Sequence, residues 1–74
     1  MIHVSKIHEL VDVLKNFELS WVSESGELVH CENCKFTSFH GSGNTFNVML
    51  LPSGEVRTVN RYTVTEINGE EVML

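Results

Sequence analysis

Residues 66–71 read Glu-Ile-Asn-Gly-Glu-Glu, with an Asn-Gly pair between two stretches of alternating apolar and polar residues. Both central positions of a type I′ turn need a positive φ, so Asn68-Gly69 predicts a tight β-hairpin. Related steps occur at Ser25-Gly26-Glu27 and, after a proline, at Ser53-Gly54-Glu55. Turns at such short intervals indicate a series of half-buried antiparallel strands.

Ahead of these strands the apolar residues recur at helical spacing. They form one stripe of five residues, Ile7, Leu10, Val11, Leu14 and Phe17, which predicts an amphipathic helix over about residues 5–16. We expect strands at about 18–23, 27–31, 34–39, 45–51, 55–60, 62–67 and 70–73. The stripe and the alternating strand positions predict a core of Leu10, Leu14, Phe17, Leu19, Phe36, Val48, Leu50, Val64 and Val72.

The predicted fold class is mainly β (α+β), in a single domain over residues 1–74. Short strands would bury too little as a flat sheet, so we expect a strongly bent antiparallel sheet that closes into a small barrel behind the helix. This layout resembles the SH3-like and Sm-like barrels. The segment Phe46-Asn47-Val48-Met49-Leu50 resembles the first Sm motif, but the Arg-Gly step of the second is missing, and Asn60-Arg61-Tyr62 stands in its place.

The chain is acidic, with ten acids, five bases and a net charge of −5. Because phosphate contacts dominate non-specific nucleic-acid affinity, this charge disfavours nucleic acid and favours a basic protein surface as partner. The longest apolar runs fall short of the 18 residues or so of a membrane span. With two cysteines and no apolar signal segment, we expect a cytoplasmic protein.

A Cys-x-x-Cys pair, Cys31 and Cys34, lies in a predicted turn at Glu32-Asn33. Two thiolates at this spacing suit a zinc knuckle, but a tetrahedral site needs four ligands and no second pair follows. We therefore expect no metal and no cofactor, with two reduced cysteines that face each other across a hairpin. A reversible disulfide is an alternative. If zinc is present, its ligands would be Cys31, Cys34, His40 and His30.

A second constellation is the run Arg57-Thr58-Val59-Asn60-Arg61-Tyr62. In an unbroken strand Arg57 and Arg61 share a face, and with Asn60 and Tyr62 they could bind a phosphate or stack on a base. The alternative is a pair of solvated arginines that offset nearby glutamates. Trp21 is a further candidate contact, since tryptophan is enriched at interfaces.

The sequence holds no phosphate loop, nucleophile elbow or His-Glu-x-x-His motif, so we expect no enzyme and no catalytic residue. The favoured function is a small non-catalytic binding module or regulator that acts by protein–protein interaction, such as a phage or mobile-element accessory protein. The alternative is nucleic-acid or nucleotide binding through Arg57, Asn60, Arg61 and Tyr62. The apolar C-terminal strand, residues 71–74, predicts a homo-oligomer or a protein partner along its edge.

Overall fold

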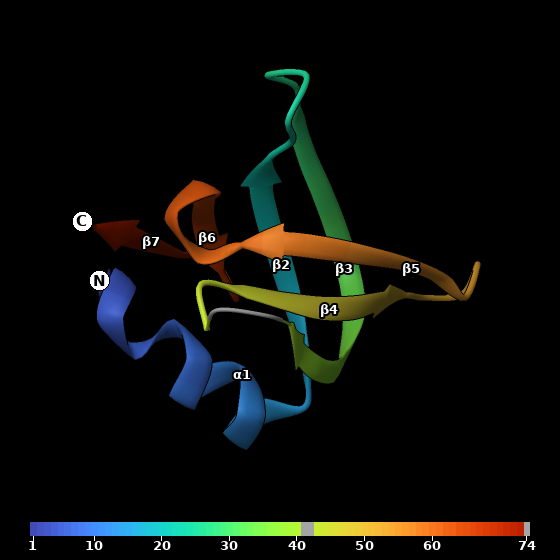
Figure 1. Cartoon of the computed structure of the whole chain (residues 1–74), viewed down its shortest axis with the longest axis horizontal. Coiled ribbons are helices and arrows are strands. Elements are labelled where there is room, and N and C mark those ends of the chain that lie inside the picture. The colour runs from blue at the N-terminus through green and yellow to red at the C-terminus, as the bar shows by residue number, and fades with distance from the viewer. Residues whose placement is uncertain (41–42, 74) are drawn as a thin grey trace.

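The computed structural model describes residues 1–40 and 43–73, apart from the side chain of His40. Within them one strongly bent sheet packs against a short α-helix (Figure 1). The helical segments are the 3-10 turn η1 (Val4–Lys6), helix α1 (Ile7–Leu14) and the 3-10 turn η2 (Arg61–Thr63). The strands are β1 (Ile2–His3), β2 (Asn16–Val22), β3 (Leu28–His40), β4 (Thr45–Leu50), β5 (Glu55–Asn60), β6 (Val64–Ile67) and β7 (Glu70–Met73). No helix of the described part is long and apolar enough to cross a membrane.

The sheet has seven strands in the order β1-β7-β6-β2-β3-β4-β5. The mainly β character with one short helix confirms the coarse part of the predicted fold class. One finer prediction is wrong: β1 runs parallel to β7, so the sheet is mixed rather than antiparallel. The predicted barrel is not confirmed, because the sheet is open, with β1 and β5 as its terminal strands. The N-terminal strand has too few residues to show any alternation, so it could not be predicted from the sequence.

The predicted Asn-Gly hairpin is confirmed. Ile67 of β6 pairs with Glu70 of β7, and the two loop residues between them have φ values of 52° at Asn68 and 81° at Gly69. Asn68 also connects the hairpin to β2. Its backbone amide donates to the backbone carbonyl of Glu18, and its side-chain Oδ1 accepts from the backbone amide of Glu18, both at 2.9 Å. The turn therefore fixes the register of β6 and β7 and docks them on β2.

Helix α1 is shorter than predicted. Its last backbone bond runs from the Lys15 amide to the Val11 carbonyl, and Lys15 leaves the helix with φ 64°. Phe17, expected at the end of the helical stripe, instead begins the alternating buried series of β2. The error has a simple cause, because Phe17 fits both patterns: it follows Leu14 by three residues and precedes Leu19 by two.

The two strands predicted at 27–31 and 34–39 are one continuous strand, β3, and no turn occurs at Glu32-Asn33. A register shift accommodates these two residues, because Phe17 pairs with Cys34 while Leu19 pairs with Cys31. The first part of β3 pairs with β2 and the last part with β4. This long strand therefore carries the bend of the sheet, and the bulge supplies the local irregularity that resembled a turn.

The C-terminal strand is not a sheet edge. β7 pairs with β6 on one side and with β1 on the other, where Ile2 lies opposite Val72 and His3 opposite Met73. The N-terminal ammonium adds an ion pair with Glu70 at 3.4 Å. The prediction of association along a free C-terminal edge is therefore wrong in its premise, with Leu74 outside the described residues. The longer terminal strand of the sheet is β5.

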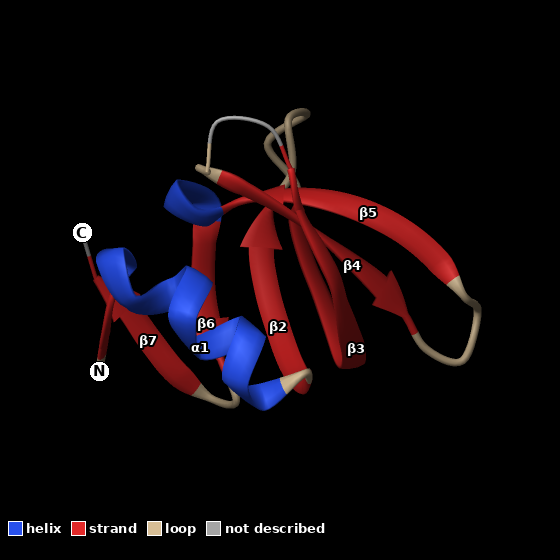
Figure 2. Ribbon diagram, turned by 60° about the horizontal axis from the view of Figure 1, so that its bottom comes forward, coloured by secondary structure: helices blue, strands red, loops and turns tan. Residues whose placement is uncertain are grey.

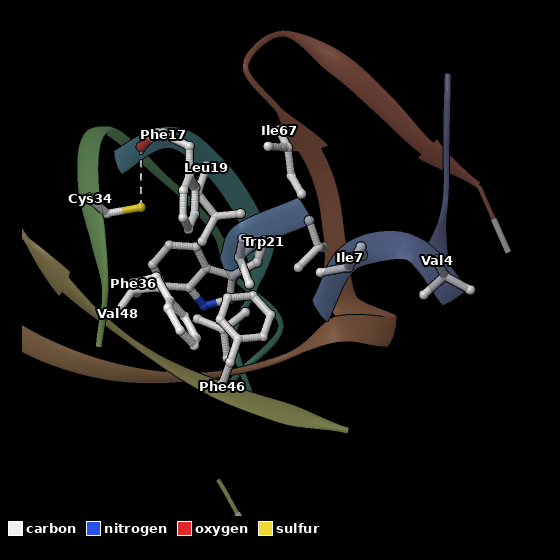
Figure 3. Close-up of a cluster of buried hydrophobic side chains, with 13 residues drawn as sticks. Val4, Ile7, Phe17, Leu19, Trp21, Cys34, Phe36, Phe46, Val48 and Ile67 are labelled. Atoms are coloured by element: carbon white, nitrogen blue, oxygen red, sulfur yellow. Dashed lines mark hydrogen bonds between the residues drawn. The ribbon is translucent and has the colours of Figure 1, made fainter. Parts of the chain in front are cut away.

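The core lies between the concave side of the sheet and α1, which contacts β2 and β3 (Figures 2 and 3). Five predicted core residues are buried, Phe17, Leu19, Phe36, Val48 and Val64. Four are only partly buried at its margin, Leu10, Leu14, Leu50 and Val72. The buried set also includes Val4, Ile7, Val11, Trp21, Cys34, Phe46, Val59 and Ile67, which the predicted core left out.

Candidate functional site

A groove of about 560 Å³ separates β5 from the turn that joins β2 to β3. In Figure 1, β5 crosses the front of the sheet and this turn rises above it. One wall comes from the end of β2 and the turn, and the other from β4, β5 and η2. The lining residues are Trp21, Val22, Ser23, Glu24, Ser25, Thr45, Arg57, Thr58, Asn60 and Thr63.

Three of the five predicted binding residues, Trp21, Arg57 and Asn60, line this groove together. Trp21 is not the exposed contact that we expected, because it is 4% exposed and belongs to the core. Arg57 is half exposed, and Glu55 holds its guanidinium: Nη2 and Nε donate to the same carboxylate oxygen at 2.6 and 2.9 Å. The opposite wall, Ser23 to Ser25, was missed because no local pattern shows that this turn faces β5.

The other two predicted residues, Arg61 and Tyr62, do not line the groove. The strand stops at Asn60, whose Oδ1 accepts the Tyr62 amide at 2.9 Å and so caps η2. The Arg61 guanidinium lies 5.1 Å from the Tyr62 ring centre, and its Nη2 donates to the Tyr62 hydroxyl at 3.2 Å. The predicted common face of Arg57 and Arg61 is therefore wrong, because the 3-10 turn redirects the chain between them.

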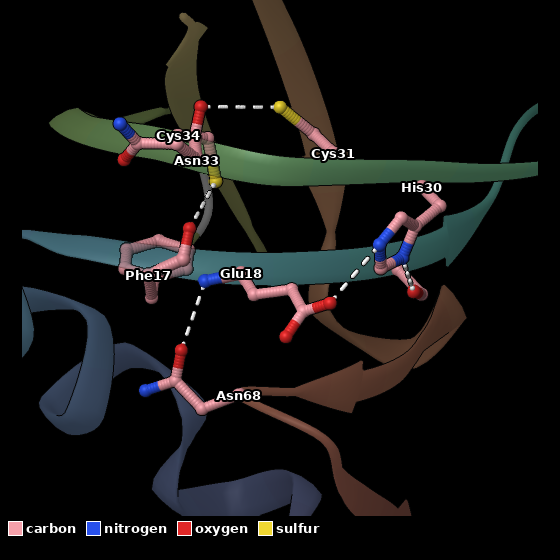
Figure 4. Close-up of polar contacts among 8 residues, drawn as sticks. Phe17, Glu18, His30, Cys31, Asn33, Cys34 and Asn68 are labelled. Atoms are coloured by element: carbon pink, nitrogen blue, oxygen red, sulfur yellow. Dashed lines mark hydrogen bonds and ion pairs between the residues drawn. The ribbon is translucent and has the colours of Figure 1, made fainter.

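The cysteines lie on one strand rather than across a hairpin. Because Cys31 and Cys34 pair with Leu19 and Phe17, the bulge turns both toward the core side of β3. Each thiol donates to a carbonyl, Cys31 to Asn33 at 3.2 Å and Cys34 to Phe17 at 3.3 Å (Figure 4). Both are free, and in the described part of the chain no three His, Cys, Asp or Glu side chains are placed to hold a metal ion.

Cys34 should resist alkylation in the folded protein while Cys31 reacts. Burial, with a smaller contribution from the neighbouring Cys31, raises the pKa of the Cys34 thiol to about 12, so almost no thiolate forms near neutral pH. Treatment with iodoacetamide at pH 8 followed by peptide mass mapping should find label on Cys31 alone until denaturant is added. Equal labelling of both cysteines in the native protein would contradict this account.

His30, a predicted zinc ligand, lies on the opposite face of the sheet from the two thiols. Its Nδ1 is 2.6 Å from the hydroxyl of Ser20, the residue directly across from it on β2, and its Nε2 is 3.0 Å from Glu18 (Figure 4). This array has the parts of an acid–base relay. However, Glu18 and Glu66 both line the 60 Å³ hollow beside Ser20. Their negative charge opposes the oxyanion that forms when a serine hydroxyl attacks a substrate carbonyl. We therefore assign the polar contacts of His30 with Ser20 and Glu18 a structural role in the pairing of β2 with β3.

His8, which the sequence did not single out, packs against aromatic side chains of the sheet. Its ring stacks on Phe39 at 4.9 Å and meets Phe46 edge-on at 5.8 Å. Both ring nitrogens are buried without a hydrogen-bond partner in the described part of the chain. Burial, and then the nearby charge of Arg61, lower the pKa of His8. His8 therefore acts as a neutral aromatic residue here.

Comparison of the chain with protein-family models, with curated proteins and with solved structures finds no match.

Proposed function

We propose that this protein is a small non-catalytic binding module that takes up an extended segment of a partner protein along β5. The observation that carries the proposal is the terminal position of this strand. β5 contributes six residues to the sheet and pairs with β4 on one side. In residues 1–40 and 43–73 no strand pairs with its other side. An unpaired edge is a template for β-strand addition.

The outward groups of β5 follow from the ladder that it forms with β4. The Arg61 amide donates to the Asn44 carbonyl at 2.9 Å, which extends the same register beyond the strand. Because bonding direction alternates along an antiparallel pair, Val59 and Arg57 turn their backbone groups toward β4. Val56 and Thr58 then turn theirs outward, while the outward carbonyl of Asn60 accepts the Thr63 hydroxyl at 2.8 Å. A partner strand would therefore pair with Val56 and Thr58.

The strand order supports the interpretation of the fold as an open sheet of the small-barrel type. The succession β6-β2-β3-β4-β5, with the 3-10 turn η2 between β5 and β6, is similar to the layout of SH3-like and Sm-like domains. Here β7 and β1 lie beyond β6 and cover that margin. This arrangement leaves β5 as the longer place for a further strand, whether it comes from another protein or from a second copy.

The alternative, nucleic-acid binding, gains no support from the arrangement of the side chains. Arg57 is held by Glu55, and Arg61 lies on Tyr62 outside the groove. Catalysis gains none either, because the groove lining has neither histidine nor cysteine, the usual base and a frequent nucleophile. Two free thiols suit the reducing cytoplasm in which we place the module.

A T58P variant should lose partner binding while it stays folded. Proline removes the outward N–H of Thr58 and is tolerated on an edge strand whose N–H faces solvent. The probe is a linear peptide selected on the wild-type protein from a random library. Its Kd should rise about tenfold or more in T58P, from the lost hydrogen bond and the added ring.

The matched control is T58V. Both variants lose the bond from the Thr58 hydroxyl to Asn47 Oδ1, but T58V keeps the backbone donor and should bind almost as the parent does. The proposal fails if selection yields no binding peptide, or if the selected peptide binds T58P as tightly as T58V. Light scattering at high micromolar concentration reports whether the free protein is a monomer, as an unoccupied β5 edge requires.

A further inference from the structure

The groove lining carries a negative charge that is not compensated within the described part of the chain. Glu24 lines the wall opposite β5, and Glu27 closes the same turn, where its carbonyl accepts the Ser23 amide at 2.8 Å. On the β5 side, Arg57 is the basic residue of the lining, and its charge is compensated by the ion pair with Glu55. Because Glu55 compensates Arg57, Glu24 is the lining residue whose charge is left without a counter-charge among the described residues, and Glu27 lies outside the lining on the same turn.

The charge of the turn is also not compensated from elsewhere in the described chain. Two further basic residues have carboxylate partners on the helical side of the molecule: Lys15 pairs with Asp12 at 2.7 Å and Lys6 with Glu9 at 4.0 Å. Glu24 and Glu27 have no ion pair within residues 1–40 and 43–73. Both are exposed.

We infer that the segment received along β5 is basic, with a lysine or arginine side chain that reaches Glu24 across the groove. This inference rests on the function proposed above. Side chains of an added strand alternate between its two faces, so a strand with a cation at every second position would present all of its cations on one face. Charge complementarity of this kind raises the association rate and selects against wrong partners.

The same charges argue against a second copy as the occupant. Each copy carries a net charge of −5, so two copies repel one another at long range, whereas a basic segment is attracted. A basic segment of another protein therefore complements the negative charge of the protein, whereas a second copy does not.

The test uses three capped six-residue peptides that alternate valine with lysine, with threonine or with glutamate. Amide chemical shifts of the full-length protein are followed during each titration, at low salt and at 0.5 M salt. The lysine peptide should bind most tightly, shift Val56 and Thr58, and lose affinity at high salt, because exposed charges are screened. In E24Q its Kd should rise about two- to five-fold, the range for one exposed ion pair.

The control E32Q makes the same change of net charge on the β3 bulge, away from the groove lining, and should leave the Kd unchanged. Equal binding of the lysine and threonine peptides at β5, tighter binding of the glutamate peptide, or equal loss in E24Q and E32Q would overturn the inference while the proposed function stands. If no peptide shifts β5, both the inference and the proposed function are wrong.

Discussion

An F46A variant is expected to lose about 3–5 kcal/mol of folding stability. Phe46 is a fully buried residue of β4, and the ring of His8 from α1 packs edge-on against its ring. Truncation therefore leaves a cavity that the neighbouring side chains cannot fill. A chain of 74 residues is expected to have only roughly 4–11 kcal/mol in total. Much of the variant should therefore be unfolded in moderate denaturant, as urea titration followed by circular dichroism would show.

The matched control for F46A is F39A. Phe39 lies directly opposite Phe46 on β3, has the same side chain and is 49% exposed. Because its ring is only half removed from water, its truncation should cost well under half as much. Equal losses for the two variants would mean that the burial of Phe46 does not hold the sheet and helix together.

An I7A variant is expected to lose about 2–5 kcal/mol, because Ile7 is the fully buried anchor of α1. Truncation weakens the packing of the helix on the sheet rather than the sheet alone. The control, V13A, lies on the same helix at 74% exposure and should change stability by no more than about 0.5 kcal/mol. Similar thermal midpoints for I7A and V13A would show that α1 does not pack as described.

The elements that the sequence predicted correctly are those whose residues are compatible with only one local structure. Asn68-Gly69 demands positive φ at two consecutive positions, and the hairpin is as predicted. The helix was placed correctly but extended too far, since Phe17 satisfies helical and strand periodicity alike. The pair Glu32-Asn33 resembles a turn in every local respect, and only the register with β2 shows it to be a bulge.

The candidate site was predictable only in part, because the groove is made of segments far apart in the chain. The predicted binding residues Trp21, Arg57 and Asn60 line it, but the helical turn η2 removes Arg61 and Tyr62. The polar array of Glu18, Ser20 and His30 depends on which residues of β2 and β3 lie opposite each other. A one-residue change of register would separate it, and no single strand carries that information.

The most direct test of the account is amide hydrogen exchange of β5 with and without a bound peptide. In the free protein the amides of Val56 and Thr58 should exchange quickly, while those of Arg57 and Val59 are protected by β4. Binding of the selected peptide should protect Val56 and Thr58 and leave the other two unchanged. Slow exchange at Val56 and Thr58 in the free monomer, or no added protection when the peptide binds, would contradict strand addition at β5.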